Sequence, residues 1–216
     1  MLFLGINSYV MFLNFKDRFE HFPVVSLHEI RKYYPNFDNR RLVEWNKKGY
    51  ITPIKRGFYR FSKQETNQST IYLIANKIYK PSYISLETAL SFYNIIPEAV
   101  FTTTSISTLN TTRNSTPYGQ FDYKHIKPAL YFGYQYLLLS GAVVSMASPE
   151  KAVLDYLYLH PELSCPADFE AMRWNKSMLA ELLNTKKILA YLTYINSKKL
   201  KLRYSHLQAY MNDRTA

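Results

Sequence analysis

The sequence predicts an α+β protein in which a small N-terminal unit of helices and a hairpin precedes a mixed α+β domain with a helical C-terminal region. Three observations predict it: helical patterns that lead into a glycine turn between two β-prone segments, a middle region of short β-prone segments, and a final stretch of successive helical patterns. With 216 residues, the chain is long enough for one large or two small domains. We place the first domain at 1–63 and the second at 70–216, joined by the polar stretch 64–69.

The first two helices of the small domain have start and stop signals. We expect an amphipathic helix over 9–19, after a short leader that lacks the positive start and the cleavage site of a signal peptide. Ser26 and Glu29 then have the spacing of a capping box, in which the hydroxyl and the carboxylate each accept a backbone N–H. The box predicts a second helix over 28–34, which Pro35 ends because proline disfavours helical geometry in the residue before it.

A third helix is predicted over 37–48, with Asn36 as its cap and Gly49 in the left-handed position that ends it. At roughly 100° per residue, Leu42 and Trp45 lie on one side of this helix and anchor it to a core. The opposite side is polar and basic, which suits the major groove of DNA, although a merely solvated basic helix has the same pattern. The residues of this helix that we expect at DNA are Asn39, Arg40, Arg41 and Lys47.

A hairpin follows the third helix. Residues 50–54 and 58–61 are β-prone, and Gly57 between them tolerates the positive φ of a tight turn. Helices followed by a hairpin with a basic tip indicate a winged helix-turn-helix, whose wing contacts phosphates or a minor groove. The alternative is a hairpin that only closes the core of the domain. The hairpin residues that we expect at DNA are Lys55, Arg56 and Arg60.

The charge of the chain is unevenly distributed. Its 27 Lys and Arg against 16 Asp and Glu leave a net charge of +11. Residues 1–80 carry +8, residues 81–175 carry −3 and residues 176–216 carry +6. Such a balance favours a polyanionic partner, namely nucleic acid, an acidic protein or a membrane surface, and general solubility is the alternative. The basic C-terminal end has no assigned partner: the acidic middle region, a DNA backbone and an acidic protein all remain open.

Few groups in the sequence suit catalysis. No two of its five histidines have metal-ligand spacing, and no glycine-rich phosphate loop is present. Cys165 is the one cysteine, which fits a reducing cytoplasm, and Glu150 suits a helix dipole better than acid catalysis. No apolar run approaches the roughly 18–20 residues of a membrane span. We therefore expect a cytoplasmic protein that is not an enzyme, with no cofactor, no metal and no membrane contact.

The second domain has helices at both ends. We expect a helix over 70–79, a short helix over 86–93 capped by Ser85, and a helix over 149–159 that starts at Ser148 and the proline after it. Short strands are predicted over 100–105, 121–123, 130–136 and 142–146, and C-terminal helices over 177–183, 186–195 and 198–211.

The order of these patterns resembles that of the AbiEi-type antitoxins. The matching stretches are LVEWNKKGYI (42–51), KRGFY (55–59), PSYISLETAL (81–90), GQFDY (119–123) and ASPEKAVLD (147–155). Each stretch is moderately specific, and their shared order carries the resemblance, which covers roughly residues 26–160.

The resemblance implies a winged-helix regulator that acts as the antitoxin of a type IV toxin–antitoxin system, linked to abortive phage infection. Its first domain would repress its own operon by binding inverted repeats in double-stranded DNA, through the residues named above. Its second domain would counteract a nucleotidyltransferase-like toxin without a stable complex. Two other interpretations stay open on the residues alone: a ligand-responsive winged-helix regulator not linked to a toxin, and a protein-interaction module.

Overall fold

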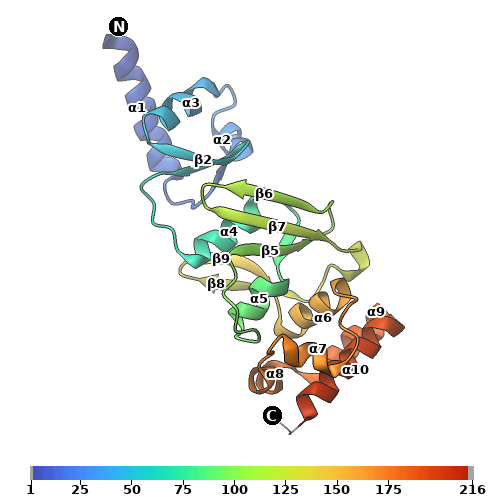
Figure 1. The fold of residues 1–216 in the computed structure, drawn as a ribbon. Helices are drawn as coiled ribbons and strands as arrows, with labels where there is room; N and C mark the ends of the chain where they lie inside the picture. The colour runs from blue at the N-terminus through green and yellow to red at the C-terminus, as the bar shows by residue number, and fades with distance from the viewer. Residues whose placement is uncertain (1, 214–216) are drawn as a thin grey trace.

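The computed structural model describes residues 2–213, with side chains from residue 11 onward, and its fold is α+β as the sequence predicts. A smaller N-terminal unit, residues 2–63, lies at one end of a larger C-terminal unit, residues 68–213 (Figure 1). Residues 1 and 214–216, which the predicted domains include, lie outside the described residues.

The N-terminal unit contains three helices and a three-stranded antiparallel sheet in the order β1-β3-β2. Its elements are α1 (Leu2–Phe19), β1 (Val25–Ser26), α2 (Leu27–Tyr33), α3 (Arg40–Lys47), β2 (Ile51–Lys55) and β3 (Phe58–Phe61). The predicted leader is wrong over residues 2–8, because α1 already begins at Leu2. Strand β1 has two residues and no sequence signal, and its pairing with β3 makes β3 the central strand.

Local signals act in α2 as predicted. The backbone N–H of Glu29 donates to Ser26 Oγ at 3.2 Å, and the backbone N–H of Ser26 donates to Glu29 Oε2 at 2.8 Å. At the turn between β2 and β3, Gly57 has a φ of +84°, the conformation for which glycine was expected there.

The start of α3 differs from the prediction. The helix begins at Arg40 instead of residue 37, and Asn36 does not cap it. Phe37 is buried in the core of the N-terminal unit, so the chain turns inward before the helix starts. The carboxylate of Asp38 then accepts the backbone N–H of Arg40 at 3.0 Å, which takes the place of the expected asparagine cap.

The C-terminal unit is built on a six-stranded mixed sheet in the order β6-β7-β5-β4-β9-β8. Its strands are β4 (Ser82–Ile84), β5 (Thr102–Ser107), β6 (Thr112–Thr116), β7 (Gly119–His125), β8 (Tyr134–Leu139) and β9 (Ala142–Ala147). Its helices are α4 (Gln68–Ile78), α5 (Leu86–Phe92), α6 (Pro149–Leu159), α7 (Pro166–Ala171), α8 (Lys176–Leu182), α9 (Thr185–Ile195) and α10 (Lys198–Asn212). The strand expected over 130–136 begins only at Tyr134, because a 3₁₀ turn occupies Pro128–Leu130.

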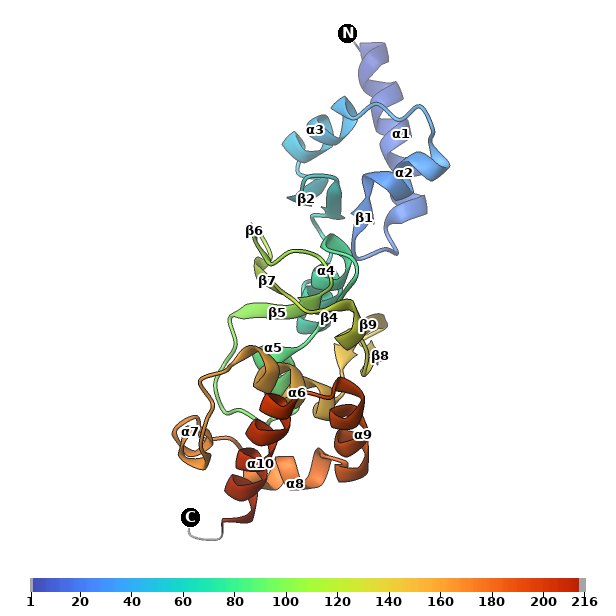
Figure 2. The same ribbon diagram turned by 90° about the vertical axis from the view of Figure 1, so that its right-hand side faces the viewer.

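Helices cover both faces of this sheet. α4 packs on one face, where the hydroxyl of Tyr123 donates to the carbonyl of Ala75 at 2.8 Å. α5 and α6 pack on the other face, and α7 to α10 form a further helical layer beyond α6 (Figure 2). The helix signal at Ser148 is confirmed, since its hydroxyl accepts the backbone N–H of Lys151 at 3.4 Å.

Buried apolar side chains form two clusters, one in each unit. The division between the units is not complete, because Val24 and Ile54 of the N-terminal unit belong to the larger cluster. The boundaries 1–63 and 70–216 therefore stay a prediction about folding units.

Candidate nucleic-acid interface

Helix α3 presents the face that its pattern predicts. Leu42 and Trp45 are buried in the core of the N-terminal unit, where Trp45 contacts the rings of Phe12 and Phe15. Of the predicted DNA-contacting residues on this helix, Asn39, Arg40 and Lys47 are exposed and Arg41 is half-buried. The anchored side thus leaves a polar, basic side in solvent.

The Arg40 side chain is exposed and is held by a neighbouring carboxylate. Its side chain is 91% exposed, and its guanidinium forms an ion pair with the carboxylate of Asp38 at 2.9 Å. The backbone N–H of Arg40, and then its guanidinium, lower the pKa of Asp38. Asp38 therefore remains charged at neutral pH and holds the Arg40 side chain at the start of α3.

The hairpin β2–β3 separates its three predicted contacts. Arg56 is exposed at the turn. Lys55 is half-buried, with its ammonium 5.9 Å from the ring centre of Phe58 and 5.7 Å from that of Tyr79, and burial lowers its pKa. The Arg56 side chain is thus accessible to a phosphate, whereas Lys55 packs at the contact between the two units.

The prediction that Arg60 contacts DNA is wrong for this conformation. Arg60 is only 2% exposed, and its guanidinium donates to the Thr66 hydroxyl and to the Glu65 carbonyl and lies 5.3 Å from the ring centre of Tyr118. The cause is the central position of β3, whose one face covers the N-terminal core while Phe58 and Arg60 face the C-terminal unit. Successive side chains of β3 do point to opposite sides, as predicted, but one side is covered by the N-terminal core and the other by the C-terminal unit.

Further polar contacts join the two units. Glu29, the capping residue of α2, forms an ion pair with Lys77 of α4. The connecting segment is held to the N-terminal unit as well, because the side-chain amide of Gln64 donates to the carbonyl of Glu20 at 2.6 Å. Partial burial raises the pKa of Glu29, but hydrogen bonds from Lys77 and Ser26 outweigh this effect and lower the pKa overall. The orientation of α2 therefore depends on a residue of the C-terminal unit.

Two stretches far apart in the sequence, 81–90 and 147–155, meet inside the C-terminal unit. Lys151 and Asp155 are each 1% exposed and form an ion pair. The hydroxyls of Tyr83 and Ser85 donate to Asp155 Oδ2 at 2.9 and 2.8 Å. Ser85 was expected to cap α5, but its side chain makes no cap hydrogen bond because it binds Asp155. The hollow beside Lys151 and Asp155 has no room for a water molecule.

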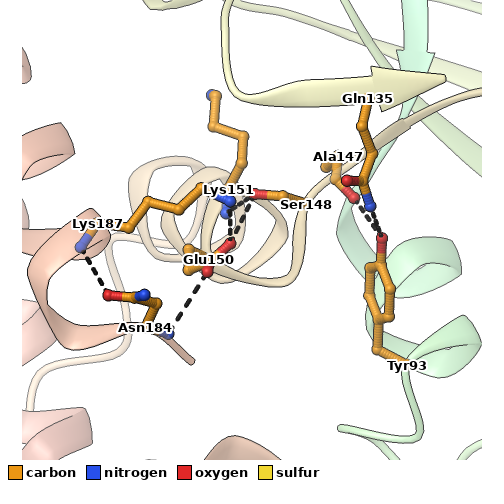
Figure 3. A network of polar contacts seen from close by, with 8 residues as sticks. All are labelled: Tyr93, Gln135, Ala147, Ser148, Glu150, Lys151, Asn184 and Lys187. Carbon is orange, nitrogen blue, oxygen red and sulfur yellow. Dashed lines mark hydrogen bonds and ion pairs between the residues drawn. The ribbon is translucent and has the colours of Figure 1, made fainter. Parts of the chain in front are cut away.

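Glu150 connects α6 to the C-terminal helices (Figure 3). Its carboxylate accepts the hydroxyl of Ser148 and the ammonium of Lys187, both at 2.8 Å, and the backbone N–H of Asn184 at 3.4 Å. Partial burial raises the pKa of Glu150, but the contacts with Lys187 and Ser148 lower it overall. Glu150 is therefore a charged carboxylate whose two oxygens both accept hydrogen bonds, and it links α6 to the start of α9.

Other chemical groups give no further site. Among residues 2–213, no group of three or more His, Cys, Asp or Glu side chains has an arrangement that holds a metal ion. Over the same residues, every helix is too short or too polar to cross a membrane. Sequence reasoning missed Arg31 and Lys32, which are exposed on α2 and add to the basic charge of the N-terminal unit.

The chain matches no protein-family model, and no curated protein matches it.

Proposed function

We propose that the N-terminal unit is a winged helix-turn-helix that binds double-stranded DNA, with α3 in the major groove and the turn of β2–β3 at the backbone. The observation that carries the proposal is the face of α3 opposite Leu42 and Trp45, where Asp38 orients a 91% exposed Arg40. The order of helix, strand, two helices and two strands, with the sheet order β1-β3-β2, supports it. A helix N-terminus with Arg and Asn suits base edges in a major groove.

Electrostatics supports the same partner. The first 80 residues carry a net charge of +8, and the exposed positions of the proposed interface are Asn39, Arg40, Lys47 and Arg56. Each phosphate neutralised by a cation releases counterions, so binding weakens steeply with salt. Arg60 is not part of this surface, since its guanidinium is bound to Thr66, Glu65 and Tyr118.

We further propose that the protein is the antitoxin of a type IV toxin–antitoxin pair, which represses its own operon and counteracts a nucleotidyltransferase-like toxin. The support is the resemblance of five ordered stretches, of which PSYISLETAL and ASPEKAVLD supply the buried cluster of Tyr83, Ser85, Lys151 and Asp155. Its test is co-expression with the protein product of the adjacent gene. Rescue of growth from that product is expected, and failure to rescue any nucleotidyltransferase-like neighbour contradicts the proposal.

A ligand-responsive regulator is the second candidate function. One observation favours it: a groove in the C-terminal unit shares Lys77 with the ion pair to Glu29 of the N-terminal unit. A ligand in that groove would contact Lys77, whose ion-pair partner Glu29 lies in the first turn of α2.

The DNA-binding proposal is tested by gel mobility shift with the DNA upstream of the gene. The double variant Arg40→Ala/Arg56→Ala should lose most specific binding, and Arg56→Ala alone should reduce the slope of log K against log salt by about 1. The double variant Lys124→Ala/Lys186→Ala is the matched control, since it removes the same charge from exposed positions of the C-terminal unit. If the Arg40/Arg56 variant binds as well as this control, the assignment of α3 and the turn is refuted.

A further inference from the structure

The groove that shares Lys77 with the ion pair to Glu29 lies between α4 and the hairpin β8–β9 and has a volume of about 530 Å³. It forms where β4 and β9 separate, since these strands pair only at Ile84 and Met146. Asn76 of α4 and Ser145 of β9 line the groove and bind each other: the Asn76 side chain accepts the backbone N–H of Ser145 at 2.7 Å and donates to the Ser145 carbonyl at 3.2 Å. The groove thus has hydrogen-bonded residues of two elements in its wall and a volume in the range of small-molecule sites.

One wall of the groove is an aromatic platform. Tyr134 stacks on the buried ring of Tyr83, with centres 5.0 Å apart and planes 14° apart. The ring centres of Tyr131 and Tyr136 lie 5.3 Å and 6.0 Å from that of Tyr134. The ring plane of Tyr136 makes an angle of 87° with that of Tyr134. Tyr136 is 70% exposed on β8, an edge strand of the sheet that carries no charged residue. An exposed aromatic ring is a surface on which a flat base stacks.

The opposite wall is cationic and has an unsatisfied hydroxyl. Lys80 is exposed, and it has no ion pair with any residue that the structure describes. Lys77 points its ammonium to Glu29, which is the one acidic partner at this end of the groove in the described chain. Ser82 is only 7% exposed, and its Oγ has no hydrogen-bond partner in the described protein. A buried polar atom without a partner is costly, and a polar ligand group would satisfy it.

We propose that this groove binds a nucleoside monophosphate, either free or at the end of a nucleic-acid strand. The base stacks on Tyr136, the phosphate lies at Lys80 and Lys77, and the hydroxyl of Ser82 donates to an oxygen of the sugar or the base. Flat aromatic surface next to two amines selects a ligand that is both planar and anionic, which neither a simple anion nor a neutral aromatic molecule satisfies.

Binding at this site reaches the N-terminal unit through Lys77. A phosphate beside Lys77 competes with Glu29, whose second oxygen holds the cap of α2 at Ser26. The ligand therefore weakens the tie between the units and changes the setting of α2 beside α3. This consequence rests on the proposed DNA-binding function, whereas the occupancy of the groove does not.

Isothermal titration calorimetry on the full chain at low salt tests the occupancy, with AMP, GMP, CMP and UMP as probes. We expect at least one dissociation constant of about 1 mM or tighter, and much weaker binding of adenosine and of inorganic phosphate. A 5′-phosphorylated trinucleotide distinguishes the two sources: tighter binding than the monophosphate assigns a strand end, and equal or weaker binding assigns a free nucleotide.

Two variants and two matched controls locate the site. Tyr136→Ala should weaken nucleotide binding by about fivefold or more, and Lys80→Ala should weaken binding of the nucleotide but not of the nucleoside. Tyr194→Ala, at a 67% exposed tyrosine of α9, and Lys199→Ala, at an exposed lysine of α10, should leave the affinity unchanged. No binding by any of the four nucleotides, phosphate binding as tight as nucleotide binding, or equal losses in the controls overturns the proposal.

The regulatory consequence has a separate readout. In the gel mobility shift, the nucleotide that binds best should change the affinity for upstream DNA in the wild type but not in Tyr136→Ala. If the protein binds no DNA at all, the proposed DNA-binding function is refuted. The calorimetry still shows whether the groove binds a nucleotide.

Discussion

Removal of Asp155 is the most severe test of how the C-terminal unit is held together. Asp155 accepts from three buried donors: the ammonium of Lys151 and the hydroxyls of Tyr83 and Ser85. Truncation to alanine leaves a buried charge without its counterion, which costs about 3–5 kcal/mol. Two unsatisfied hydroxyls add about 1–3 kcal/mol each before relaxation. The total approaches the whole stability of a typical domain, about 5–15 kcal/mol.

Graded variants keep this prediction measurable even if Asp155→Ala does not fold. Asp155→Asn retains an acceptor for the hydroxyls but loses the charge opposite Lys151, so we expect a loss of about 3 kcal/mol. The double variant Lys151→Met/Asp155→Leu removes both charges and should be more stable than Asp155→Ala, because a well-packed apolar pair replaces the buried ions. Glu162→Gln, at an exposed carboxylate, is the control and should change stability by less than about 0.5 kcal/mol.

Urea unfolding followed by tryptophan fluorescence is the assay. Trp45 lies in the core of the N-terminal unit and Trp174 in that of the C-terminal unit, so the Trp45→Phe background lets Trp174 report on the unit that contains Asp155. A loss below about 1 kcal/mol for Asp155→Asn, or a double variant less stable than Asp155→Ala, refutes the assignment of this cluster as a stabilising buried ion pair.

Two further predictions concern the contact between the units. The pKa of Glu29 is lowered in the folded protein, so its stabilisation is present above its ordinary value of 4.5 and is lost as the pH falls through the folded pKa. The urea midpoint of Glu29→Gln should therefore be lower than that of wild type at pH 7, and the two midpoints should converge in acid. A difference between the two midpoints that does not change with pH contradicts this prediction. Arg60→Ala should destabilise the protein by about 1–3 kcal/mol and speed proteolysis near residues 62–67, because Thr66 and Tyr118 lose their partner. Proteolysis no faster than in the Arg173→Lys control contradicts that role.

Elements with local causes were predictable from neighbouring residues. The capping box of Ser26 and Glu29, the glycine turn at Gly57 and the start of α6 at Ser148 all involve groups within three residues of one another. The inward side of α3 was predictable as well, because helical periodicity places Leu42 and Trp45 together. These local signals predict most of the helices. They do not predict the two-residue strand β1, which is defined by its pairing with β3.

The candidate sites divide in the same way. Residue spacing alone was enough to assign the exposed side of α3 and the position of Arg56 at a turn. The burial of Arg60 could not be read from its strand, because it depends on β1 on one side and on Tyr118, 58 residues later, on the other.

The sequence by itself determined the α+β class, the basic N-terminal unit and the local start and stop of its helices, since these follow from propensity, spacing and net charge. Only the tertiary structure decided that Lys151 and Asp155 meet Tyr83 and Ser85 in a closed core, and that Lys80, Ser82 and Tyr136 line one groove. The physical reason is that strand pairing and burial join residues about 50 to 70 positions apart, for which a local pattern has no signal.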